Sequence, residues 1–431
     1  MRLRKLETNS AKRPAKASQA SPADPPAMYR KAPQPPNDSL TWHGITLYGG
    51  VDMGIGYQTH GAPLSNDAGF GVSYLISRNS RSPYFGVAPN GFGGSYLGLK
   101  GEEPLLPGLS GIFNLQTSFL PTSGHLSDGL GSIVQNNGLP LASTTTFADS
   151  SKDGQPLNTV AYAGLSSKTF GTLTYGRQNS LTLDGVIAYD PMSASGAFSL
   201  IGFQGATAGM GDTENARLDN SLKYTVGVGP FRAAAAAQLS SDGGGEARRI
   251  LQGQVGMDYA GLSLDAIYGQ VKDAVSAAPL PVGFTPTPAQ LLSAGNGLVA
   301  GTISDNTGLM LLGRYTVGPL KLYAGYENIR FTNPSIPLPV GTTIIGGYSL
   351  GTANNAAFTN NRILQVFWTG AKYTVRPDLD LIVADALRVS HRLHLVILVE
   401  FVERDRMVVD GSRHTGRGSF VASGHGNDGG Q

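Results

Sequence analysis

The stretch GTLTYGRQNSLTLDGVIAYDP, from Gly171 to Pro191, places one cation directly before an acidic segment. Its first part, Thr172 to Arg177, is rich in β-forming residues and ends on the arginine. The following segment carries Asp184 and Asp190. What chemistry this arrangement serves depends on the elements around it.

Residue types that do covalent or metal chemistry are sparse. The chain has no cysteine, which excludes disulfide frameworks and thiolate zinc sites. Before the last fifty residues the histidines are His43, His60 and His125, and two of them lie in glycine-rich loops. No Gly-x-Ser-x-Gly elbow, phosphate-binding Gly-x-x-x-x-Gly-Lys loop or His-Glu-x-x-His metal motif occurs. We therefore expect no catalytic residues, no cofactor-binding residues, no metal site and no enzyme activity.

Composition separates the chain from ordinary soluble proteins. Of 431 residues 59 are glycine, and only 14% are charged, against roughly 25% in a typical soluble domain. No apolar run approaches the ~20 residues that a membrane-spanning helix needs. The net charge of +2 hides a basic excess in the first 39 residues, so it gives no reason to expect nucleic-acid binding.

Three segments differ in character. Residues 1–39 are rich in proline, alanine and lysine and predict a disordered arm. Their charged start lacks the apolar stretch of a secretory signal, so we expect either that the signal lies upstream of an incorrectly assigned start or that the chain is not exported. Residues 40–381 alternate apolar and polar side chains in runs of about ten, which is typical of half-buried strands.

About a dozen such runs can be counted, with a short thirteenth near 379–384. They fall near 44–57, 94–102, 109–119, 158–167, 171–178, 216–226, 230–240, 248–260, 262–272, 308–317, 320–331 and 363–375. A length of about ten residues suits a strand that crosses a bilayer at a tilt, whereas globular strands are mostly ~5–6 residues long. Short and long connections between the runs also alternate along the chain, as in outer-membrane barrels. The pattern predicts an all-β transmembrane antiparallel barrel; a soluble β-sandwich or β-helix with long loops is the alternative.

Four sequence stretches, in order, carry a family resemblance. ITLYGGVDMGIGYQTH, YLGLKGEE, VAYAGLSSKTFGTLTYGRQN and ARLDNSLKYTV resemble the general porins of Gram-negative outer membranes. The resemblance covers about residues 40–381 and implies a sixteen-stranded, commonly homotrimeric barrel surrounded by outer-membrane lipid. It implies a passive, water-filled diffusion channel for ions and small hydrophilic solutes. A non-conducting surface barrel or adhesin and a defective truncated porin remain alternatives.

The resemblance also assigns roles to the charged residues of the opening stretch. In the family, the loop after the fifth strand folds into the barrel and narrows the pore, and here that loop is about 179–215. Its acidic members would be Asp184 and Asp190, facing wall cations Arg177, Arg217 and Lys100. Tyr96 stands where the family often has arginine, so the ion selectivity of the family cannot be assigned to this chain. Arg177 lies at alternate positions from Leu173 and Tyr175, so a regular pleat places all three side chains on the same face of the strand. A β-bulge at Gly176 is needed to turn Arg177 into the lumen instead.

The last segment, 382–431, lacks the strand rhythm of the middle. It has no tyrosine or tryptophan and ends GHGNDGGQ, whereas family members end on a strand that closes with an aromatic residue. We hypothesise that this tail comes from a shifted reading frame, which resequencing of the coding region tests. An intact frame, with no porin-like strands readable in the other frames downstream, would exclude the hypothesis.

Overall fold

The structure is a computed structural model and describes fourteen stretches of the chain, namely 40–58, 84–90, 94–124, 126, 156–194, 217–239, 249–277, 301–335, 344–345, 348–349, 362–376, 379–388, 391–401 and 420–422. The expected arm 1–39, most of the expected loop 179–215, and His60 and His125 lie outside the described residues.

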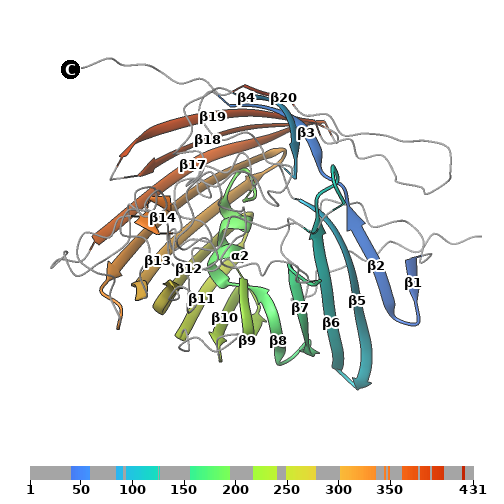
Figure 1. The fold of residues 1–431 in the computed structure, drawn as a ribbon. Helices are drawn as coiled ribbons and strands as arrows, with labels where there is room; N and C mark the ends of the chain where they lie inside the picture. Colours follow the sequence, from blue (N-terminus) through green and yellow to red (C-terminus); the bar gives the residue numbers. More distant parts are fainter. Residues whose placement is uncertain are drawn as a thin grey trace, which may run out of the picture.

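One long antiparallel sheet dominates the fold (Figure 1). Its sixteen strands follow each other in the order β1, β2, β5 to β14, and β17 to β20. Their bounds are β1 Thr41–Trp42, β2 Ile45–Gly50, β5 Ser95–Leu106, β6 Leu109–Phe119, β7 Val160–Ser167, β8 Gly171–Asn179, β9 Arg217–Val228, β10 Phe231–Gln238, β11 Arg249–Tyr259, β12 Leu262–Ala277, β13 Gly301–Val317, β14 Leu320–Thr332, β17 Arg362–Arg376, β18 Leu379–Arg388, β19 His391–Phe401 and β20 Phe420–Ala422. Two separate hairpins pair β3 (Met53–Gln58) with β4 (Tyr84–Pro89), and β15 (Ile344–Ile345) with β16 (Tyr348–Ser349).

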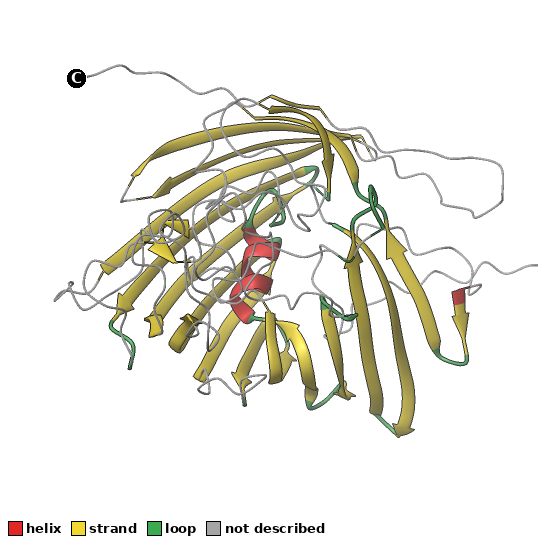
Figure 2. Cartoon of the chain, in the orientation of Figure 1, coloured by secondary structure: helices red, strands yellow, loops and turns green. Residues whose placement is uncertain are grey.

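The sheet curves around a short helix, α2 (Leu181–Tyr189), which lies on its concave side (Figure 2). The helix contacts β10 to β14. Within the described residues, no helix has the length and apolarity needed to cross a membrane.

The strands have one apolar and exposed face on the convex side. In β5, Leu97 and Leu99 are exposed, while Gly98 between them is buried, and Tyr96 and Lys100 on either side are partly covered on the concave side. The antiparallel register carries this alternation from strand to strand, because residues directly opposite each other share a face. The alternation predicted for this strand is therefore confirmed.

Tight turns join neighbouring strands at one end of the sheet. They span 107–108, 168–170, 229–230, 260–261 and 318–319. The predicted run 94–102 is too short, because β5 continues through Pro104 to Leu106. A register shift between Pro104 and Leu106 accommodates the proline, which cannot donate a ladder hydrogen bond.

One further expectation about strands is wrong. The single run 44–57 is divided at Val51 and Asp52 into β2, which pairs with β5, and β3, which pairs with β4. The end of the middle segment at 381 falls inside β18, and β19 follows it. The run His391–Phe401 is rich in leucine, valine and isoleucine, and a continuous apolar run of this kind forms strands without a visible two-residue rhythm.

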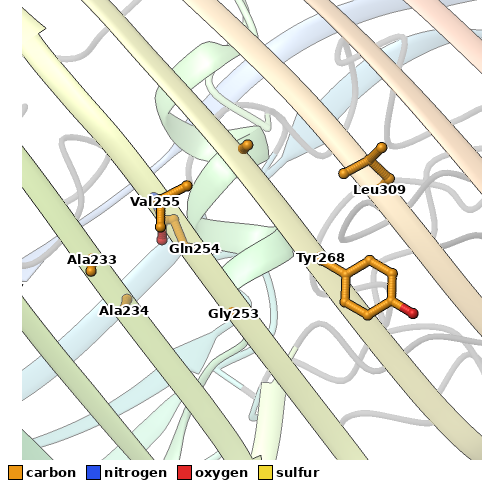
Figure 3. A pocket seen from close by; sticks show the side chains of 8 residues that line it. Ala233, Ala234, Gly253, Gln254, Val255, Tyr268 and Leu309 are labelled. Carbon is orange, nitrogen blue, oxygen red and sulfur yellow. The ribbon is translucent and has the colours of Figure 1, made fainter.

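An apolar hollow of about 460 Å³ lies on the convex face of β10 to β13. Alanine and glycine form its floor, and Val255, Tyr268 and Leu309 stand around it, with α2 behind the sheet (Figure 3). These three side chains belong to the exposed outer face. The hollow is therefore a dent in the outer surface and lies away from the charged residues.

Candidate functional site

A β-bulge turns Arg177 away from the outer face. Leu173 and Tyr175 are exposed, whereas Arg177 is only 4% exposed. The register of β8 against β9 shifts between Gly176 and Gln178, and Gly176 has φ 135°. A Cβ at Gly176 would lie 2.2 Å from the carbonyl oxygen of Ala161, so only glycine fits here. The bulge that an inward Arg177 requires is thus present.

The Arg177 guanidinium joins three strands. Its Nε and Nη2 donate to the Asn158 carbonyl oxygen just before β7, at 2.9 and 2.7 Å. Its Nη1 donates to Asp219 Oδ1 of β9 at 2.7 Å. The side chain therefore holds β7, β8 and β9 together near their loop ends. Arg217, at the start of β9, is 8% exposed and lies opposite Asn179 in the register.

The first turn of α2 carries Asp184. Ser180 is the N-cap, and its Oγ accepts a hydrogen bond from Leu183 N at 3.1 Å. Asp184 forms an ion pair with Lys223 of β9. It also accepts a hydrogen bond from Asn179 Nδ2 at 3.1 Å. A carboxylate in the first turn is favoured by the helix dipole.

Asp190 ends the helix. It is 2% exposed, and its Oδ1 and Oδ2 accept hydrogen bonds from Met192 N and Ala194 N at 3.0 and 2.9 Å. Both oxygens of its carboxylate therefore bind the backbone of the turn that follows α2. This geometry differs from that of Asp184, which faces the strand wall.

Four strands hold the C-terminal end of α2. The Tyr189 hydroxyl accepts a hydrogen bond from Arg232 Nη2 at 2.6 Å and lies 2.8 Å from Ser263 Oγ. The Tyr189 carbonyl accepts one from Trp368 Nε1 at 3.2 Å. Arg314 Nη1 donates to the Ala188 carbonyl at 3.1 Å. Burial, and after it the charge of Asp265, raises the pKa of Tyr189, so its hydroxyl stays protonated.

Two carboxylates hold the Arg232 guanidinium in place. Asp265 receives Arg232 Nε and Nη2 at 3.0 and 2.8 Å, which is a bidentate pair. Asp258 forms a second ion pair with the same guanidinium. Arg232 is thereby fixed on β10 in the orientation in which it binds Tyr189.

An apolar cluster covers one half of the concave face. Side chains of α2 and the following turn belong to it, and on the strands it includes Ile267, Met310 and Leu312. The cluster continues as Leu218, Ala236, Ile250, Val271, Ile329, Phe331, Leu364, Val366, Trp368, Ile382 and Ala384. Its strand side chains come from β9 onward, and the helix itself rests mainly on β10 to β14.

The other half of the concave face is polar. Asn114, Gln116 and Ser118 of β6 and Thr172 and Thr174 of β8 are buried polar residues on this side. Lys100 of β5 lies opposite Asn114, and its Nζ is 5.6 Å from the centre of the Tyr48 ring. A hydrophilic wall over β2 and β5 to β9 is thus left beside the helix.

The structure brings only some of the predicted pore residues together on the lumen side. Asp184 and Lys100 lie on the lumen side, Arg177 binds Asp219, and Asp190 closes a turn. Sequence reasoning missed Lys223, although it shares a polar strand face with Arg217 in the run ARLDNSLKYTV. It also missed the anchoring residues Arg232 and Arg314, for which no local sequence signal exists. Among the described residues, no cluster of histidine, aspartate or glutamate could hold a metal ion.

Comparisons with known proteins agree with this architecture. A family model described as Gram-negative porin matches residues 15–381. An outer membrane porin protein of Bordetella pertussis is 30% identical over 186 residues, which are 42% of this chain and 38% of that protein. The chain thus matches well under half of that relative's length.

A solved structure shares the fold. The anion-selective porin from Comamonas acidovorans superposes with a TM-score of 0.52 at 20% sequence identity, over 82% of each chain. At this identity the likeness concerns the fold alone. Together with the family match over most of its length, it shows that the chain belongs to the Gram-negative porin family of the outer membrane.

Proposed function

We propose that this chain forms a passive, water-filled diffusion channel for ions and small hydrophilic solutes across the outer membrane. One observation carries the proposal: a sheet with an apolar convex face encloses a polar wall and an inward-folded helix. The apolar face suits lipid, which offers no hydrogen bonds. The polar wall suits water and dissolved solutes.

The solute path runs between α2 and the wall formed by β2 and β5 to β9. The opposite half of the lumen is filled where α2 packs on the apolar cluster. Charges beside the path are largely compensated, since Asp184 pairs with Lys223 and Arg177 pairs with Asp219. Lys100 contributes a cation that faces a tyrosine ring rather than a carboxylate. Such an arrangement favours anions moderately and leaves neutral solutes unhindered.

We also propose that three copies assemble into a homotrimer, as the family resemblance implies. Cross-linking of the protein extracted in mild detergent tests this assembly, with a ladder that ends at three copies as the expected result.

Reconstitution tests the channel itself. In planar lipid bilayers the purified full-length chain should give discrete current steps in potassium chloride, and liposomes that contain it should swell in small sugars. An inserted, correctly folded protein that gives neither current nor swelling would refute the channel and favour a non-conducting surface barrel.

A further inference from the structure

Two tyrosine rings and one ammonium group lie side by side on the polar wall. Tyr48 of β2, Tyr96 of β5 and Lys100 of β5 form this group, which we name the tyrosine–lysine shelf. The two ring centres are 6.0 Å apart with 55° between the planes, and Lys100 Nζ lies 5.6 Å from the Tyr48 ring centre. All three side chains are partly exposed on the concave face.

Glycines allow both rings to lie across the wall. Tyr48 is opposite Gly98, and Tyr96 is opposite Gly50, in the same antiparallel register. A Cβ at Gly98 would lie 2.4 Å from Tyr48 Cζ, and one at Gly50 would lie 3.3 Å from the Tyr96 ring. Each ring therefore covers the glycine on the neighbouring strand and turns its other face toward the lumen.

Hydrogen bonds fix the Tyr48 ring in this position. Its hydroxyl binds Asn114 Oδ1 and donates to Gln116 Oε1 at 3.0 Å. The orientation of the Tyr48 ring, beside which Tyr96 and Lys100 lie, is thus set before any solute arrives, which reduces the entropy lost on binding. The cation, by contrast, lies over a ring face and keeps hydrogen-bond donors for a ligand.

A ring face beside an ammonium group matches one ligand chemistry. A planar aromatic carboxylate can stack on a tyrosine ring while its charged group meets Lys100. A saturated carboxylate of similar size gains only the charge contact, and a neutral aromatic compound gains only the stacking.

We propose that the tyrosine–lysine shelf is a binding site for small planar aromatic carboxylates on the solute path. The inference rests on the proposed channel function and adds a substrate class to it. Tyr96 supplies the stacking surface, Lys100 supplies the charge, and Tyr48 positions Lys100.

Ion permeation through the reconstituted full-length channel tests the site. The probes are benzoate and cyclohexanecarboxylate, which carry the same charge but differ in planarity and aromaticity. Reversal potentials under gradients of each salt give their permeability ratio, which should favour benzoate. Tyr96→Leu should lower this ratio roughly twofold to tenfold, the factor that corresponds to the usual energy of one aromatic pair.

Two further variants separate charge from stacking. Lys100→Gln should reduce the permeability of both carboxylates relative to potassium while it leaves their ratio nearly unchanged. Tyr315→Leu removes an exposed tyrosine from the outer face and should leave every ratio unchanged.

The outcomes distinguish the site from the channel. Absence of conductance in the unchanged protein would refute the proposed function. The protein could instead conduct with equal permeability for the two carboxylates, or with a permeability ratio that Tyr96→Leu leaves unaltered. Either result would refute the proposed binding site but not the proposed channel function.

Discussion

Lys223 on strand β9 forms an ion pair with Asp184 in the first turn of α2. The pair joins the wall to the helix inside the lumen, and both side chains are mostly buried. It cancels the acidic charge that the helix would otherwise present to the solute path. Selectivity thus depends on whether this pair is intact.

Removal of the lysine should therefore change ion preference. Lys223→Met leaves the Asp184 carboxylate uncompensated, and we expect the reversal potential in a potassium chloride gradient to shift toward cations. Lys272→Met is the matched control, because it breaks an exposed ion pair with Asp305. A cation shift of equal size in both variants would contradict a specific role for the Lys223 pair.

Substitutions at Arg177 test whether this buried cation affects ion selectivity or the free energy of unfolding. Arg177→Ala leaves the Asn158 carbonyl and the Asp219 carboxylate without this partner, which should cost about 3 kcal/mol of unfolding free energy. Thermal unfolding of the barrel in detergent measures this loss.

Arg177→Lys separates the two roles, since it keeps the charge and loses the double contact with the Asn158 carbonyl. We expect near-normal ion selectivity and a lowered unfolding temperature. A normal unfolding temperature with altered selectivity would assign Arg177 directly to the pore.

Gly98→Ala should narrow the solute path. The added methyl group would meet the Tyr48 ring at 2.4 Å, so the ring must swing away from the wall into the lumen. Single-channel conductance should fall. Gly253→Ala is the control, because its methyl group meets no atom within 4 Å; an equal conductance for both variants would show that the ring has another way to move.

Tyr189→Phe should loosen the end of α2. The change deprives Arg232 and Ser263 of their hydroxyl partner and should cost about 1 kcal/mol. Open-channel current noise should rise because the helix end moves more freely. Tyr259→Phe changes an exposed outer tyrosine and should leave the noise as it is.

The same tyrosine predicts a dependence on alkaline pH. Its ordinary pKa is 10.0, and burial raises the folded value. The stabilisation is fully present below pH 10 and is lost as the pH rises toward the folded pKa, because the unfolded chain ionises first. The unfolding temperature should therefore fall above about pH 10, and the fall should be smaller in Tyr189→Phe.

Many of the strands could be predicted from sequence. Where the outer face of a strand contacts lipid and its inner face is polar, apolar and polar side chains alternate with a period of two residues. The start of the run Ser95–Leu106 shows this, as does the first half of Leu320–Thr332, where exposed Leu322 is followed by buried Tyr323. The rhythm fails in β13, where exposed Leu309 and Leu311 alternate with buried Met310 and Leu312. Both faces are apolar there because the inner one packs on α2 rather than on water. A local pattern cannot reveal which strands an inward loop will cover.

The site was less predictable than the wall for a related reason. The bulge at Gly176 could be anticipated from the parity of Arg177, because a strict pleat would have placed a charge in lipid. The partners of that charge could not be anticipated, since Asn158, Asp219 and Arg177 meet only through the register of three strands.

The anchoring of α2 has a mechanical consequence. The backbone N–H of its first residue, Leu181, donates a hydrogen bond to Gln252 Oε1 of β11, and its last residue, Tyr189, binds groups from β10, β12 and β17. The strands β10, β11 and β12 are neighbours, and β17 lies further along the same sheet. A rod tied along this continuous part of the wall stiffens it against bending, so under lateral pressure from the bilayer an inward movement of these strands would require the ties to break first.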